Sequence, residues 1–109
     1  MEVYLDNSAT TKPYEEAVNV MCEVMSSNYA NPSSLHRMGK FAEDSLNKSR
    51  ETLAKSIGCS PNEFYFTSGG TESNNLAIIG YAMANKREGN RIITQPTEHA
   101  AVLEPFKYL

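Results

Sequence analysis

The sequence predicts an α/β fold, and two observations support this. Short apolar runs, typical of buried strands, alternate with longer segments whose apolar residues recur at helical spacing. Between positions 63 and 94, a strand, a crossover helix and a second strand follow one another over about 30 residues, the length of a βαβ unit. Such a unit makes its strands parallel. Because two strands cannot form a normal parallel sheet, we interpret the chain as the front of a larger domain with an incomplete sheet.

The first half of the chain is predicted to contain two helices. Pro13 starts a helix that runs from Tyr14 to about Met25, with two acids in its first turn where the helix dipole favours them. A loop covers residues 28–34. A longer helix from about Leu35 to Ile57 follows, because its apolar residues keep helical spacing, and Gly58 ends it.

The second half is predicted to alternate strands and helices. A strand from Glu63 to Thr67 leads into a glycine turn, and the helix after this turn ends near Arg87. A second strand covers residues 91–94. The last helix is expected from Glu98 to Leu109, with Thr97 as its N-cap.

Composition narrows the range of functions. The 109 residues amount to one small domain, with 40% hydrophobic residues and a net charge of −3. Ten Lys and Arg are scattered among thirteen Asp and Glu, so we expect no nucleic-acid partner. Without a membrane-length apolar run or a signal peptide, we predict no membrane association and a cytoplasmic location. Cys22 and Cys59 are expected to be free thiols, and no metal site is predicted.

The most informative segment is the turn Ser68-Gly69-Gly70-Thr71-Glu72-Ser73. It opens a helix, whose first N–H groups have no partner within the helix and lie at the positive end of its dipole. Such a helix start can bind phosphate without a lysine or arginine. Because the P-loop ending and the dinucleotide spacing are both absent, the turn favours a single phosphate on a small cofactor. A purely structural turn is the alternative.

Three other polar segments could carry chemistry. Thr97-Glu98-His99 follows the second predicted strand, at the sheet edge where ligands of α/β proteins collect. In the first turn of a helix, His99 would favour a neutral, flat ring that can stack on another aromatic ring; an exposed histidine is the alternative. The runs from Asp6 to Thr11 and from Asn31 to His36 can equally be turns and helix caps.

In this order and spacing, the segments resemble the N-terminal part of cysteine desulfurases of the NifS/IscS type. The motifs that carry the resemblance are Val3 to Thr11, Asn31 to His36, Phe66 to Ala77 and Thr97 to His99, and together they cover essentially the whole chain. The resemblance implies the N-terminal portion of the large domain of the pyridoxal-phosphate-dependent transferase fold type I, within the class-V aminotransferases. Residues 1–12 would form an N-terminal arm, and residues 13–109 the front part of the large domain.

The resemblance also implies an activity. Enzymes of this family use pyridoxal 5′-phosphate to take sulfur from L-cysteine, which leaves L-alanine and a persulfide on a catalytic cysteine. They are homodimers, and they pass the sulfur to iron–sulfur cluster scaffolds or to thiolation pathways. By position, Gly70 and Thr71 would hold the cofactor phosphate through backbone N–H groups and the threonine hydroxyl. His99 would stack on the pyridine ring and assist proton transfer as a catalytic residue.

The family also needs a Schiff-base lysine, an aspartate, a mobile-loop cysteine and a substrate-binding arginine, and none of these matches a position in this chain. We therefore expect the chain to be inactive alone, with the apolar faces of its strands open, and to be a truncation product, an expressed piece or part of a split gene. Alternative interpretations are a selenocysteine lyase or an aminotransferase of the same class, a non-catalytic phosphate-binding or interaction module, and an inert remnant.

Overall fold

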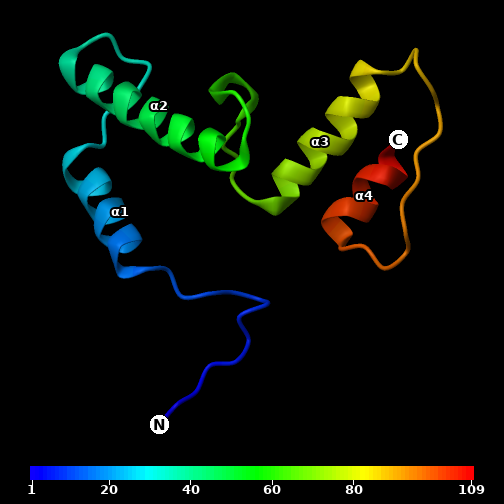
Figure 1. The fold of residues 1–109 in the computed structure, drawn as a ribbon, viewed down its shortest axis with the longest axis horizontal. Helices are drawn as coiled ribbons and strands as arrows, with labels where there is room; N and C mark the ends of the chain where they lie inside the picture. Colours follow the sequence, from blue (N-terminus) through cyan, green and yellow to red (C-terminus); the bar gives the residue numbers. More distant parts are fainter. The chain divides into compact units, whose positions relative to one another are not determined.

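Four α-helices and one short 3₁₀-helix make up the regular structure of the chain (Figure 1). The computed structural model describes all residues, 1–109. The elements are α1 (Glu15–Ser27), α2 (Arg37–Ile57), η1 (Pro61–Glu63), α3 (Gly70–Ala84) and α4 (Ala100–Tyr108). By its internal contacts the chain divides into two units, Met1–Phe64 and Tyr65–Leu109. No helix combines the length and the apolar character that crossing a bilayer requires.

Helices α1 and α2 confirm the two helices predicted for the first half. The acids Glu15 and Glu16 lie in the first turn of α1, as expected from the helix dipole. Gly58 ends α2 in the left-handed conformation, with φ of 75°, and its N–H donates to the carbonyl groups of Ala54 and Lys55. The sequence therefore placed this helix end correctly from a single glycine.

The start of α2 depends on a close approach of backbone to backbone. His36 caps the helix, because its Nδ1 accepts the N–H of Gly39 at 3.2 Å. Gly39 is buried against the preceding loop, where a Cβ atom would lie 2.1 Å from the carbonyl oxygen of Ser34. Glycine is thus the only residue that fits without a shift of the backbone.

Replacing Gly39 with alanine should therefore disrupt the start of α2. We expect a cost of about 2 kcal/mol, because the new methyl group forces the Ser34 backbone away. Amide hydrogen exchange should speed up at residues 39–42, while the C-terminal half of α2 stays protected. Gly80→Ala is the matched control, since a Cβ atom at Gly80 in α3 meets nothing within 4 Å. Unchanged exchange at the start of α2 in the Gly39 variant would contradict the expectation.

The predicted strands at Glu63–Thr67 and at residues 91–94 are corrected by the structure, which contains no β-strand. Residues 61–63 instead form η1, which Ser60 and Glu63 close as a capping box. Phe64 still has extended dihedral angles, with φ of −104° and ψ of 120°. A strand is defined by its neighbour, and neither segment has another strand beside it. The βαβ unit and its sheet are therefore not formed by these residues.

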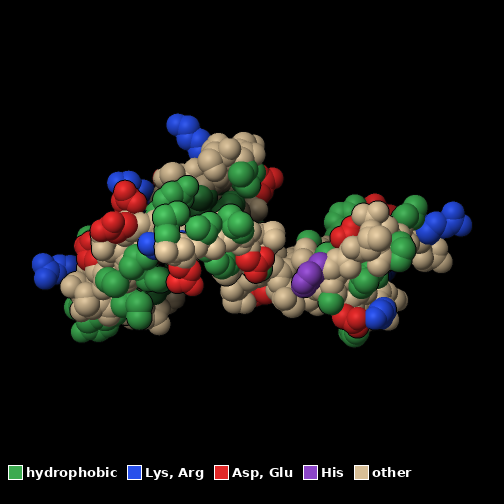
Figure 2. Space-filling view, turned by 90° about the horizontal axis from the view of Figure 1, so that it is seen from below, with side chains coloured by type: hydrophobic (Ala, Val, Ile, Leu, Met, Phe, Trp, Pro, Cys, Tyr) green, Lys and Arg blue, Asp and Glu red, His purple; other side chains and the backbone are tan.

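In the second unit, α3 and α4 pack against each other and begin at the same end of the unit (Figure 1). Helix α3 ends at Ala84, slightly before the predicted end near Arg87. Most large apolar side chains remain exposed, and hydrophobic side chains (green) are visible among the polar ones on the face shown in Figure 2. Leu35 is fully exposed and Ile93 is 85% exposed, and only Ala54 forms a fully buried hydrophobic core position. The 109 residues therefore leave most of their own large apolar side chains in contact with solvent.

Candidate functional site

The turn that leads into α3 is held by side-chain hydrogen bonds. The hydroxyl groups of Thr67 and Ser73 lie 2.6 Å apart, and the Thr67 hydroxyl donates to the carbonyl oxygen of Gly69 at 3.3 Å. Glu72 reaches back to Ser68, whose N–H and hydroxyl both donate to its Oε2 at 2.6 Å. The two residues before the N-cap are thereby bound to the first turn of the helix.

Amides at the start of α3 remain available for a ligand. The N–H groups of Gly70 and Thr71 have no acceptor in the chain, and neither has the Thr71 hydroxyl. A Cβ atom at Gly69 or Gly70 would meet nothing within 4 Å, so the space beside the turn is open. The α3 dipole adds partial positive charge at this end. Amide donors, dipole and open space together fit a phosphate group.

Neither glycine of this turn is required by a left-handed conformation. Gly69 is fully extended, with φ of 163° and ψ of −179°, and Gly58 is the only glycine with a left-handed φ. What the glycines provide is open space beside the free amides rather than a special turn geometry.

Glu72 adds a negative charge to the same turn. The hydrogen bond from the Ser68 hydroxyl, followed by that from the Ser68 N–H, holds the pKa of the Glu72 carboxyl below its ordinary value. The group is therefore ionised at neutral pH, and both hydrogen bonds that it accepts are charge-assisted. An acid in the first turn is also favoured by the helix dipole. Sequence analysis missed this interaction, although the Ser-x-x-x-Glu spacing resembles a capping box displaced by one residue.

His99 is the N-cap of α4, so the prediction of Thr97 for this position is wrong. Its Nδ1 accepts the N–H of Ala101 at 3.0 Å, and the helix begins at Ala100. His99 thus lies one position before the first turn rather than within it. Because an accepting Nδ1 carries no proton, Nε2 carries the proton of the neutral ring. No hydrogen bond within the chain uses Nε2.

An open groove between α3 and α4 is a second feature, which sequence analysis did not predict. Its volume is about 600 Å³, and it lies in the unit formed by residues 65–109. Half of its eight lining residues are apolar and half are polar: Asn74, Ile78, Ile93, Thr94, Gln95, Glu98, Val102 and Phe106. Gly70, Thr71 and His99 are not among these residues, so the groove does not bring the predicted site residues together.

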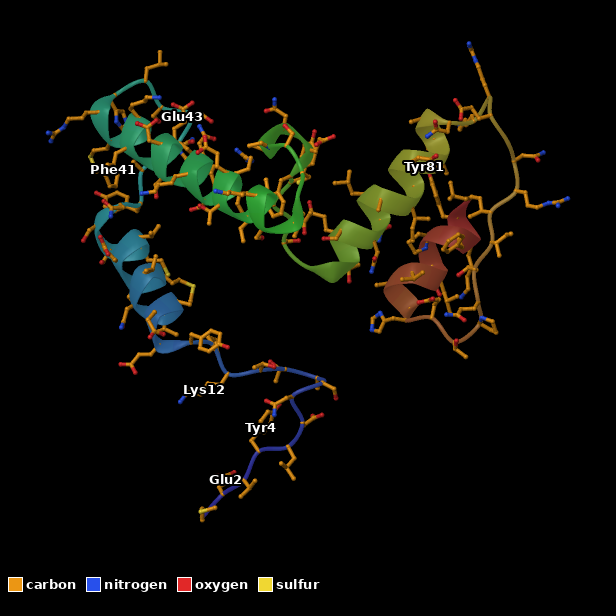
Figure 3. The ribbon with its side chains drawn as sticks, in the orientation of Figure 1. Glu2, Tyr4, Lys12, Phe41, Glu43 and Tyr81 are labelled. Carbon is orange, nitrogen blue, oxygen red and sulfur yellow. The ribbon has the colours of Figure 1, made fainter.

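The other two polar segments fold as local turns. Tyr4 lies in the segment before α1 (Figure 3), and its hydroxyl lies within hydrogen-bond distance of the carbonyl oxygens of Asp6 and Thr10, at 2.9 and 3.0 Å. The N–H of Ser33 donates to the side chain of Asn31 at 2.9 Å, and His36 then caps α2. Both segments therefore have the turn and cap structure that was the structural alternative for them.

Comparison with known proteins places these features in a family. Residues 3–109 match the family model for class-V aminotransferases. The chain is 48% identical over 107 residues to a cysteine desulfurase IscS of Methanosarcina thermophila, covering 98% of this chain and 26% of that protein. It is 46% identical over 108 residues to a cysteine desulfurase IscS of Dictyoglomus turgidum, covering 99% of this chain and 27% of that protein.

A solved structure shows the same fold. The chain superposes on a NifS-like protein with a TM-score of 0.92 and 42% identity, covering 99% of this chain and 30% of that one. It spans about a quarter of the length of the curated relatives that it matches. The match over nearly all of its residues shows that the chain belongs to the class-V aminotransferase family.

Proposed function

We propose that this chain provides the cofactor-phosphate site of a cysteine desulfurase that depends on pyridoxal 5′-phosphate. The observation that carries the proposal is the pair of unpartnered amides at Gly70 and Thr71, at the start of a 15-residue helix. The identity to cysteine desulfurases over nearly the whole chain supports the choice of family member. When bound, the cofactor supplies an electron sink for chemistry at the α-carbon of the substrate.

The residues of this chain would then have distinct tasks. Gly70 and Thr71 donate their N–H groups to the phosphate, and the Thr71 hydroxyl adds a third donor. His99 would stack on the cofactor ring and assist proton transfer at the substrate as the catalytic residue. Nε2 is the ring nitrogen left free to contact the substrate, because the N–H of Ala101 engages Nδ1.

We further propose the substrate and partners of the complete protein. L-cysteine gives L-alanine, and the sulfur passes to an iron–sulfur scaffold or another acceptor. The protein acts as a homodimer, with residues 1–12 as an arm and residues 13–109 as the front part of the large domain. The free thiols Cys22 and Cys59 support a reducing, cytoplasmic location.

A chimera tests the proposal. Residues 3–109 of this chain replace the matching segment of the M. thermophila relative, and the purified protein receives pyridoxal 5′-phosphate and L-cysteine. We expect L-alanine and sulfide, in the presence of a thiol reductant, at a rate within about tenfold of the unmodified relative, a difference of about 1.4 kcal/mol in the barrier. A folded chimera that binds no cofactor and releases no L-alanine would refute the proposal.

A further inference from the structure

Glu72 is the one charged side chain in the proposed phosphate turn for which the proposed function gives no task. Its Oε2 accepts both donors of Ser68, and its other carboxylate oxygen has no partner in the chain. Both groups that bind the Glu72 side chain in this turn thus belong to Ser68, which directly precedes the N-cap residue Gly69.

The negative charge of the Glu72 carboxylate opposes phosphate binding at this helix start. An ionised acid and a phosphate at the same helix start repel each other, so the charge by itself would weaken phosphate binding. The contact with Ser68 has an opposite effect, since it fixes the backbone that enters α3. The amides of Gly70 and Thr71 follow directly from this backbone, which Thr67 also holds through the Gly69 carbonyl oxygen and the Ser73 hydroxyl.

We propose that Glu72 is a positioning residue of the cofactor-phosphate site: by holding Ser68, it keeps the free amides of Gly70 and Thr71 in the arrangement that an anion requires. The inference rests on the proposed function, because it assumes that these amides bind the phosphate. It assigns Glu72 no contact with the cofactor.

Two variants of the full 109-residue chain separate the effect of the contact with Ser68 from the effect of the Glu72 charge. Glu72→Ala removes the acceptor and the charge, whereas Glu72→Gln removes the charge and keeps an oxygen that can accept from Ser68. The probe is pyridoxine 5′-phosphate, which carries the phosphate and the ring but no aldehyde that could react with surface lysines. Binding is followed through the amide NMR shifts of Gly70 and Thr71, with pyridoxine as the phosphate-free control.

We expect Glu72→Ala to weaken the probe about fivefold, and Glu72→Gln to restore affinity to within about twofold of the wild type. The Ser68 amide signal should move upfield in the alanine variant even without probe, because its hydrogen bond is lost. Glu16→Ala is the matched control, since Glu16 is an exposed acid in the first turn of α1 without a hydrogen bond to its cap. It should leave affinity unchanged.

Three results would contradict the inference. If both Glu72 variants bind the probe more tightly, Glu72 acts only through its charge, and the inference is wrong while the phosphate site stands. If both bind as the wild type does, the inference is equally wrong. If the wild-type chain shows no phosphate-dependent shift at Gly70 and Thr71, the proposed site and the inference fail together. Should Glu72→Ala not fold, Ser68→Ala replaces it, with an expected weakening of about twofold through loss of the hydroxyl donor.

Discussion

A chimera that carries His99→Asn should lose at least about a hundredfold of its desulfurase activity while α4 keeps its cap. Asparagine is a good N-cap, so its side chain can replace Nδ1 as the acceptor for the N–H of Ala101. It offers neither a ring to stack on the cofactor nor a nitrogen for proton transfer. The measurement is L-alanine formation at saturating pyridoxal 5′-phosphate.

His99→Ala separates the two tasks of this residue. It should lose as much activity as the asparagine variant and, in addition, destabilise the start of α4 by about 1 kcal/mol. Hydrogen exchange at Ala101 and Val102 reports this loss, and should be slower in His99→Asn than in His99→Ala. An asparagine variant with nearly full activity would show that His99 serves only as a cap.

Replacing Gly70 with proline should weaken the binding of pyridoxine 5′-phosphate about tenfold or more without breaking α3. Gly70 is the first residue of the helix, where proline is well tolerated because the N–H there has no partner inside the helix. Open space around its Cβ position leaves room for the ring. The substitution therefore removes one amide donor from the proposed site and little else.

Gly70→Ala is the control, because it adds a methyl group in the same open space and keeps the N–H. Its affinity for the probe should equal that of the wild type. Equal binding by the proline and alanine variants, with α3 intact in both, would mean that the Gly70 amide does not hold the phosphate. The Thr71 amide shift then shows whether any part of the turn contacts the probe.

Local sequence signals predicted the helices of the chain well. The apolar spacing of α2 and the glycine at position 58 act within a few residues, so both could be found without knowledge of the fold. The strands at 63–67 and 91–94 failed because pairing depends on residues that are distant in sequence. An extended, apolar segment shows only that a strand is possible, and a neighbour decides whether it forms.

For the same reason, the sequence predicted only the local features of the candidate site. The free amides of Gly70 and Thr71 follow from any helix start, and were expected from the glycine turn. The cap of α4 was misplaced because Gln95 and Glu98 close a turn of their own, in which the N–H of Glu98 lies 3.4 Å from the carbonyl oxygen of Gln95. This turn places Thr97 before the helix and leaves the capping position to His99.

Because few apolar side chains are buried, unfolding of the isolated polypeptide should change its heat capacity little. Heat capacity rises on unfolding mainly because apolar groups become hydrated, and here most of them are in contact with solvent from the outset. Heating the isolated polypeptide should therefore give a broad, shallow transition, in which helices melt one after another. A sharp endotherm would instead report that molecules of the polypeptide had associated and shielded these groups from water.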